Sequence, residues 1–127
     1  MAHPQVIKKL SLKCEKLPDS SLLDLIFRDQ KQRLTGAELK KKFATNTGMY
    51  GLEEYRLQKI KEMLECVENA RILYIIFDTR SHEWLSANFA RLLTYDYRIT
   101  DGPTWYGGIK VIKPICYWPI QLWKVFV

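Results

Sequence analysis

Chemically versatile side chains stand close together just after an apolar run in the middle of the chain. Residues 72–77 form that run, and Asp78, Arg80, Ser81 and His82 follow it. A carboxylate and an imidazole within reach of one substrate act as acid and base, and a guanidinium beside them holds an anion. If a helix begins at Ser81, its free backbone N–H groups also favour a phosphate or a carboxylate. The four residues are therefore a candidate anion site, at which a small hydrolase or nuclease would act.

The other interpretation of this segment is structural, because Asp and Ser side chains commonly satisfy the amides of turns and helix caps. No metal-ligand spacing and no glycine-rich phosphate loop supports catalysis there. His3 and His82 are the only histidines, and Cys14, Cys66 and Cys116 are far apart and form no CxxC pair. We therefore predict no catalytic residue, no metal and no cofactor. We also expect reduced, mostly buried cysteines in a cytoplasmic protein.

A second candidate is the mixture of aromatic and basic residues in the last third of the chain. Exposed aromatic rings beside cations on a sheet are typical of surfaces that stack single-stranded nucleic acid. Exposed rings also anchor protein partners, although a small sheet under helices needs some of them in its core. Trp105 and Tyr106, in a loop with glycine and proline, are the rings least easily placed in a core. The candidate binding residues of this third are Arg98, Trp105, Tyr106, Lys110 and Lys113.

Basic residues of the first half suggest another way of binding nucleic acid. Successive helices followed by a strand would fit a helix-turn-helix or winged-helix arrangement over residues 21–77. Two glutamates, at positions 53 and 54, oppose it because they would turn negative charge towards DNA. A helical bundle whose lysines form a solvated face is the favoured alternative. The candidate phosphate-binding residues of this half are Lys40, Lys41, Lys42 and Arg56.

The elements that position these residues are clearest over residues 52–78. Leu57, Ile60, Met63, Leu64 and Val67 recur at three- and four-residue steps with polar residues between them. This spacing predicts an amphipathic helix over 52–68. The run at 72–77 is rich in β-branched and aromatic residues, which predicts a buried central strand.

Three more helices are predicted before that stretch. Apolar residues at helical spacing predict the first over 6–17, before Pro18. Ser21 and Asp24 have the spacing of a capping box for the second, over 21–27. Thr35 and Glu38 have the same spacing for the third, over 35–44, whose terminal lysines suit the helix dipole.

A mixture of strands and one helix is predicted for the second half. Ser81 is the expected N-cap of a helix over 82–93. Alternating residues at 95–100 predict a half-buried strand, whose return beside its neighbour is either parallel or antiparallel. Two further strands are predicted at 109–113 and 120–127. Pro114 and Pro119 then belong to a sheet edge, a strand start or a loop.

Together these elements predict an α+β protein with a single domain, residues 1–127. Its N-terminal half, residues 1–70, has about four helices and packs on a small mixed or antiparallel sheet of residues 71–127, with one inserted helix. A hydrophobic content of 47% argues against disorder. No apolar run approaches the roughly 18 residues that a membrane span needs, so we expect no membrane association.

The net charge of +6 favours nucleic acid or an acidic surface as a partner. We therefore expect a small, non-enzymatic, cytoplasmic interaction protein, a regulator or inhibitor, that binds nucleic acid or a nucleoprotein through a basic and aromatic surface. The first alternative is a purely protein-binding inhibitor or adaptor that uses the Trp105 loop and the end of the chain, where strand pairing would also allow homodimers. The second alternative is the hydrolase or nuclease at 78–82.

Overall fold

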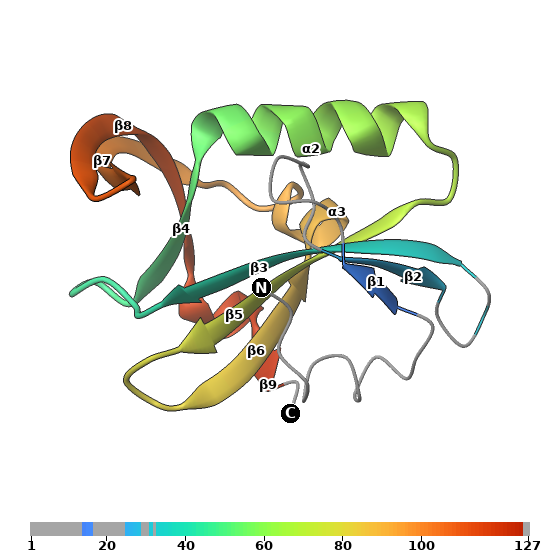
Figure 1. Cartoon of the computed structure of the whole chain (residues 1–127), viewed down its shortest axis with the longest axis horizontal. Helices are drawn as coiled ribbons and strands as arrows, with labels where there is room; N and C mark the ends of the chain where they lie inside the picture. The colour runs from blue at the N-terminus through green and yellow to red at the C-terminus, as the bar shows by residue number, and fades with distance from the viewer. Residues whose placement is uncertain (1–13, 17–24, 29–30, 32, 126–127) are drawn as a thin grey trace.

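The computed structural model describes residues 14–16, 25–28, 31 and 33–125 of the chain, which form two sheets and three helical segments (Figure 1). Sheet A has the strand order β1 (Cys14–Lys16), β2 (Leu25–Arg28), β3 (Leu34–Lys42), β5 (Arg71–Asp78), β6 (Glu83–Asn88) and β9 (Lys124–Val125). Sheet B has the order β4 (Met49–Glu53), β8 (Ile109–Pro119) and β7 (Arg98–Tyr106). The helical segments are α2 (Glu54–Cys66), α3 (Phe89–Leu92) and the 3₁₀ turn η1 (Ile120–Leu122).

The predicted N-terminal helical half is wrong. Only the helix expected at 52–68 is confirmed there, as α2. Strand β3 lies where the helix over 35–44 was expected, and β1 and β2 lie within the ranges of the two earlier helices or next to them. The rest of those two predicted helices, residues 6–13, 17 and 21–24, lies outside the described residues. The described part of the chain is therefore mostly β.

Strand β3 forms because its backbone is paired on both sides. β2 pairs with it in antiparallel and β5 in parallel orientation. These two ladders satisfy the N–H and C=O groups that a helix would satisfy locally. Gly36 within the segment also disfavours a helix, by about 1 kcal/mol relative to Ala. The capping-box spacing of Thr35 and Glu38 is coincidental, and both side chains are buried in the strand.

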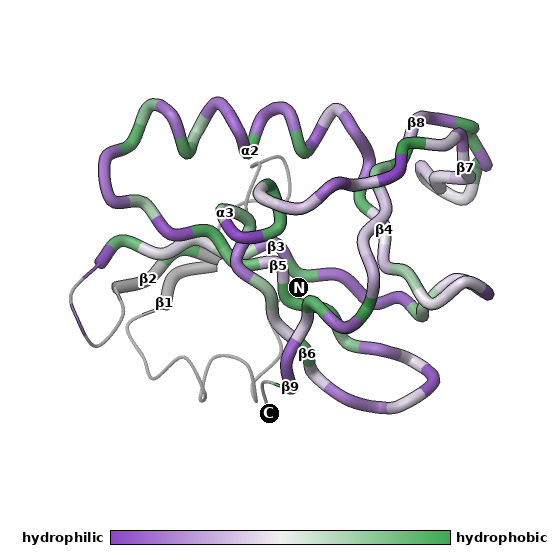
Figure 2. Tube along the Cα trace, turned by 180° about the vertical axis from the view of Figure 1, so that it is seen from behind, coloured by the Kyte–Doolittle hydropathy of each residue, from purple (hydrophilic) through white to green (hydrophobic). Residues whose placement is uncertain are grey.

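Helix α2 and strand β5 both follow their predicted patterns. Leu57 and Ile60 of α2 are completely buried, and Met63 and Leu64 pack at the margin of the core. Figure 2 shows the corresponding alternation of hydrophobic and hydrophilic residues along the helix. β5 is confirmed as a central strand, since β3 pairs with one of its edges and β6 with the other. The helix and the strand together supply one side of the core.

The helix predicted over 82–93 is wrong, because the chain turns back after β5 as the antiparallel strand β6. Trp84 and Ala87 of β6 are buried between its neighbours. Only α3 is helical in this segment, and its N-cap is Asn88 rather than Ser81. The Asn88 Oδ1 atom accepts a hydrogen bond from the Ala90 N–H at 2.9 Å. The apolar spacing that predicted one helix over 82–93 therefore comes from two short elements in succession, β6 and α3.

The strands expected at 95–100 and 109–113 are parts of one long hairpin, β7–β8, in sheet B. Gly107 and Gly108 form its two-residue turn with φ angles of +56° and +82°, which a turn of this length favours at both positions. Pro114 lies within β8, beyond Ile115, where pairing with β4 ends, so β8 has only one neighbour there. The strand expected at 120–127 is replaced by η1 and the short β9.

Aromatic side chains join the two sheets in the core. The Tyr74 ring stacks on Phe89 with centroids 5.2 Å apart and meets the edge of Trp123 at 5.7 Å. The indole N–H of Trp123 donates to the Tyr74 carbonyl at 3.2 Å, and that of Trp118 donates to the Leu92 carbonyl at 3.0 Å. Buried indoles are stable when such partners are present. Trp118 and Trp123 are thus core residues.

Changing Ile60 to Ala should lower the free energy of unfolding by about 2–5 kcal/mol, because the side chain is fully buried and its loss leaves a cavity. Urea denaturation measures the change. Val67→Ala, at the partly exposed end of the same helical stripe, is the matched control and should cost less than about 0.5 kcal/mol. Equal effects of the two substitutions would mean that α2 does not pack through Ile60.

Candidate functional site

The β7–β8 hairpin forms an arm that curls away from sheet A beside the first turn of α2 (Figure 1). Side chains alternate between the two faces of a strand, and directly paired residues share a face. The pairing register therefore assigns each arm residue to a face. The inner face carries Arg98, Thr100, Gly102, Thr104, Tyr106, Ile109, Val111, Lys113, Ile115 and Tyr117. The outer face carries Ile99, Asp101, Pro103, Trp105, Lys110, Ile112 and Pro114, and at the root of the arm it continues into the core with the buried Cys116.

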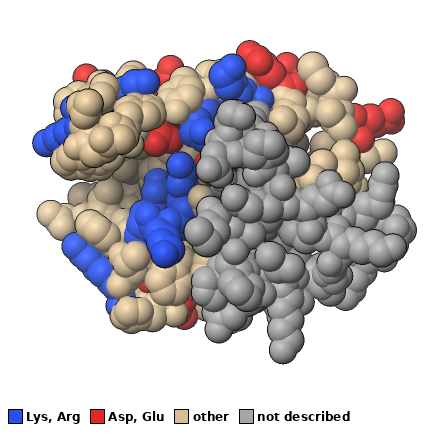
Figure 3. Space-filling model, in the orientation of Figure 1, with Lys and Arg blue, Asp and Glu red and all other residues tan. Residues whose placement is uncertain are grey.

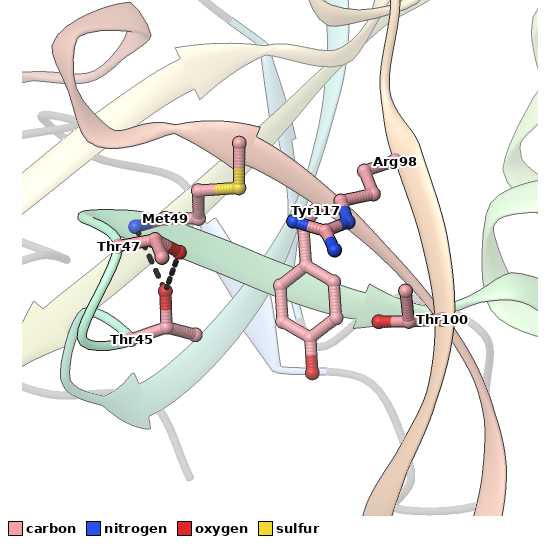
Figure 4. A pocket seen from close by; sticks show the side chains of 6 residues that line it. All are labelled: Thr45, Thr47, Met49, Arg98, Thr100 and Tyr117. Atoms are coloured by element: carbon pink, nitrogen blue, oxygen red, sulfur yellow. Dashed lines mark hydrogen bonds between the residues drawn. The ribbon is translucent and has the colours of Figure 1, made fainter.

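A pocket of about 240 Å³ lies at the root of the inner face (Figure 4). Arg98 and Tyr117 are direct cross-strand partners, and both side chains line the pocket. The Thr45 and Thr47 hydroxyls are 3.0 Å apart on the opposite wall. The pocket thus combines one guanidinium, one aromatic ring and several hydroxyl groups. Its lining residues are Thr45, Thr47, Met49, Arg98, Thr100 and Tyr117.

Two glycines fix the position of the Tyr117 ring. A Cβ atom on Gly51, the β4 partner of Tyr117, would lie 2.7 Å from the Tyr117 Cε1 atom. A Cβ atom on Gly102 would lie 3.0 Å from the Tyr117 hydroxyl and 2.7 Å from the Ile115 Cδ1 atom. Real Cβ atoms do not approach other atoms so closely, so larger residues at either position would push the ring aside. The glycines therefore let Tyr117 lie flat beside the pocket.

The tip of the arm is attached to the start of α2. The Tyr106 hydroxyl donates to the Tyr55 hydroxyl at 3.2 Å. The Lys113 Nζ atom lies 4.7 Å from the centre of the Tyr106 ring and 4.9 Å from that of Tyr55. Such cation–π contacts contribute about 0.5–1 kcal/mol each at exposed sites. The inner face of the arm is thereby attached to the first turn of α2.

Figure 3 shows a hollow on this side of the molecule, between the atoms of the arm and those of the chain below it, with Lys and Arg atoms along its margin. The lysine run of β3, however, does not form one basic surface. Because side chains alternate between the two faces of a strand, Lys41 lies on one face of sheet A and Lys40 and Lys42 lie on the other. Lys41 is exposed, and Lys42 is largely covered.

The cations on the second of these faces are paired within the protein. The buried Glu38 carboxylate accepts a 2.8 Å hydrogen bond from Arg56 Nη2, and Lys40 Nζ lies 3.6 Å from its other oxygen. Lys42 donates to the Gly51 carbonyl. Burial lowers the pKa of the Lys42 amine to about 8, although the nearby carboxylates of Glu53 and Glu38 oppose the shift. These cations mainly stabilise the junction of β3, β4 and α2.

Asp78 is the last residue of β5, and Arg80, Ser81 and His82 follow it in the β5–β6 turn, not at a helix N-terminus. The Asp78 Oδ1 atom accepts hydrogen bonds from the backbone N–H groups of Arg80 at 2.8 Å and Ser81 at 3.0 Å, and its Oδ2 atom accepts one from the Tyr50 hydroxyl. Burial by itself would raise the pKa of Asp78, but these hydrogen bonds outweigh it and hold the pKa below its ordinary value. The two amides therefore already have a carboxylate as their acceptor.

The aromatic candidates are divided between opposite faces of the arm. Trp105 and Lys110 are direct partners on the outer face, and the Trp105 side chain is 65% exposed. Tyr106 and Lys113 lie on the inner face with Arg98. The structure therefore does not bring all the candidate residues together. It places Arg98 in the pocket and the pair Trp105 and Lys110 on the other side of the hairpin.

Several pocket residues were not among the predicted site residues. Tyr117 could have been found from the sequence. It lies as many residues after the Gly107–Gly108 turn as Arg98 lies before it, so the hairpin register pairs the two residues. No sequence pattern pointed to Thr45, Thr47 and Met49, because they precede or begin β4 in a segment whose sequence is typical of a loop. They reach the pocket through the pairing of β4 with β8.

Among the described residues, no group of His, Cys, Asp and Glu side chains is arranged to hold a metal ion. Within the same part of the chain, no helix has the length and apolar character needed to cross a membrane. Cys116 is buried, as predicted for the cysteines, and its burial raises the pKa of its thiol to about 11. Cys66, at the end of α2, is exposed, which contradicts that prediction.

No protein-family model matches the chain, and a search of curated proteins finds no similar sequence. The function therefore has to be argued from the geometry of the arm, the pocket and the turn.

Asp78→Asn should lower the free energy of unfolding at neutral pH by about 1–3 kcal/mol, because three hydrogen bonds lose their charged acceptor. The folded-state pKa of Asp78 is depressed, so its contribution is present above the unfolded-state pKa of about 3.9 and is lost as the pH falls through the folded-state value. Denaturation across a pH series should show the gap between the two proteins closing below about pH 4. Asp96→Asn, at an exposed aspartate, is the control; a pH-independent gap would contradict the assignment.

Lys42→Met should remove a pH dependence of stability on the alkaline side. The folded-state pKa of Lys42 is lowered from 10.5 to about 8, so between these values the unfolded chain holds a proton that the folded chain has released. Raising the pH through this window therefore increases the unfolding free energy of the original protein relative to Lys42→Met. Urea denaturation at several pH values measures the difference. A constant difference would show that the Lys42 amine remains charged in the fold.

Proposed function

We propose that this protein is a small, non-enzymatic interaction protein that binds single-stranded nucleic acid on the inner face of the arm. The observation that carries the proposal is the pocket in which Arg98, Tyr117 and threonine hydroxyls converge. A guanidinium suits a phosphate or a base edge, and an aromatic ring suits a stacked base. Hydroxyl groups complete such sites by bonding to phosphate and sugar oxygens.

The size of the pocket favours an unpaired nucleotide over a duplex. Pockets for drug-sized ligands are about 300–1,000 Å³ in volume, so a pocket of about 240 Å³ suits one base or one phosphate group. A base within a duplex is already stacked and cannot enter it. Unpaired bases can be splayed out and stacked on an aromatic side chain. We therefore expect a preference for single strands.

The distribution of charge predicts a moderate dependence on salt. The net charge of +6 attracts a polyanion, but Arg56, Lys40 and Lys42 are engaged with Glu38, Gly51 and their neighbours inside the protein. One or two phosphates at the pocket would give a slope of log K against log salt of about −0.7 to −1.4 for a single strand. A strongly basic groove would give a steeper slope.

A purely protein-binding module is the second candidate. It is favoured by the exposed apolar side chains on the outer face of the arm, because such patches commonly anchor partners. Exposed apolar side chains on the outer face do not explain the pocket on the inner face, so we rank the protein-binding function below nucleic-acid binding. A hydrolase at residues 78–82 is not proposed, because Asp78 is 6% exposed and its carboxylate accepts the hydrogen bonds of the turn.

Fluorescence anisotropy with labelled single-stranded RNA and DNA, and with the matching duplexes, tests the proposal across a salt series. Tyr117→Leu should weaken single-strand binding by about 5- to 150-fold, the usual value of one stacked base. Arg98→Ala should weaken it and reduce the salt slope by about 0.7. Tyr117→Phe keeps the ring and should bind nearly as the original protein does.

Lys59→Ala is the control for charge alone, because Lys59 is an exposed cation on α2. Thermal melting of each variant separates loss of binding from loss of fold. The proposal fails if no single strand binds at low salt, or if Lys59→Ala weakens binding as much as Arg98→Ala does.

A further inference from the structure

The outer face of the arm is an exposed apolar surface. The side chains of Trp105 and Ile112 are 65% and 58% exposed, and Pro103 and Pro114 are exposed beside them. Figure 2 shows the hydrophobic residues of the β7–β8 hairpin at the end of the molecule, away from sheet A. Small proteins seldom leave such a row uncovered unless a partner binds it.

The two charged residues of this face are arranged symmetrically about its centre. From the root of the arm to its tip, the cross-strand pairs are Asp101 with Pro114, Pro103 with Ile112, and Trp105 with Lys110. Successive pairs on one face are two residues apart, about 6.7 Å along the strands. The apolar Pro103–Ile112 pair therefore lies midway between an acidic and a basic end.

We propose that the outer face binds a second copy of this chain, with a two-fold axis through the Pro103–Ile112 pair and perpendicular to the strands. This operation reverses the direction of the strands and superimposes the tip of one arm on the root of the other. Trp105 and Lys110 of one copy then cover Asp101 and Pro114 of its partner. Each Lys110 then lies diagonally across from the partner's Asp101, which is on the neighbouring strand, and the two Lys–Asp ion pairs flank a central contact between the two isoleucines.

Charge complementarity selects this arrangement over the alternative. A two-fold axis parallel to the strands would place both lysines at one end of the interface and both aspartates at the other. Like charges would then be diagonal neighbours at each end, which destabilises the pairing. The perpendicular axis brings opposite charges together at both ends. It yields an isologous, closed interface of the kind that homodimers use.

The proposed dimer is weak and depends on concentration. Its contact is one face of a two-stranded hairpin, which is at or below the low end of the roughly 1,200–2,000 Å² that specific interfaces bury. We therefore expect the dissociation constant of the dimer to be in the micromolar range or above. The dimer does not depend on the nucleic-acid proposal, because the Arg98 pocket opens on the other face of the arm.

Sedimentation velocity of the full chain over a series from low micromolar to several hundred micromolar tests the inference. The original protein should shift from monomer to dimer along the series. Asp101→Lys and Lys110→Asp should each weaken association at least tenfold, because both ion pairs become repulsive. The double variant Asp101→Lys with Lys110→Asp should recover it, since the swap restores opposite charges at both ends.

Ile112→Asp should abolish the dimer, and Ile109→Asp is its matched control. Ile109 is 68% exposed, close to the 58% of Ile112, but it lies on the inner face of the same strand. Both sites are exposed, and circular dichroism and melting curves should show both variants folded. A chain that stays monomeric throughout the series overturns the inference. So does a dimer that Ile109→Asp breaks as readily as Ile112→Asp, or a double variant that recovers nothing.

Discussion

The carbonyl oxygen of Gly51 ties sheet B to sheet A through two hydrogen bonds. β4 is an edge strand of sheet B, and the Gly51 carbonyl accepts hydrogen bonds from the Tyr74 hydroxyl at 2.6 Å and from Lys42. Both donors belong to sheet A. Burial raises the pKa of Tyr74 well above its ordinary value, so its hydroxyl remains a donor. Because Gly51 also makes room for Tyr117, the same residue joins the sheets and shapes the pocket.

How much of the fold could be predicted depended on where the stabilising partners lie in the sequence. The residues of α2 satisfy their own backbone and present one apolar stripe, and the apolar run of β5 is long enough to be a buried strand without reference to its neighbours. Both were therefore predictable from a short window. β3 was not, because it pairs with β5 on the far side of helix α2, and β6 was not, because one of its two partners, β9, comes much later in the chain. Capping-box and helical spacings at Thr35 and Ser81 are short patterns that tertiary pairing readily overrides.

The candidate site was predictable in part for a related reason. From the sequence, Arg98, Trp105 and Lys110 were near one another only as neighbours along the chain. The exposure of Trp105 was expected correctly, but the loop of glycine and proline in which it was expected is part of strand β7. Which of them share a face depends on a register that the Gly107–Gly108 turn defines. A strand has a side-chain period of two, so three consecutive lysines such as Lys40, Lys41 and Lys42 cannot form one patch. The predicted helix would have distributed them quite differently.

The two faces of the arm carry different kinds of side chain, so they are suited to different partners. The inner face carries Arg98 and the aromatic ring of Tyr117 beside hydroxyl groups, and the outer face carries apolar residues between one acid and one base. A single-stranded polyanion and a second copy of the chain would therefore not compete for the same side chains. In the proposed dimer the inner faces of the two arms point away from each other. One strand of nucleic acid that reached both pockets would bind with the avidity of two linked sites, so weak self-association and weak single-site binding would reinforce each other.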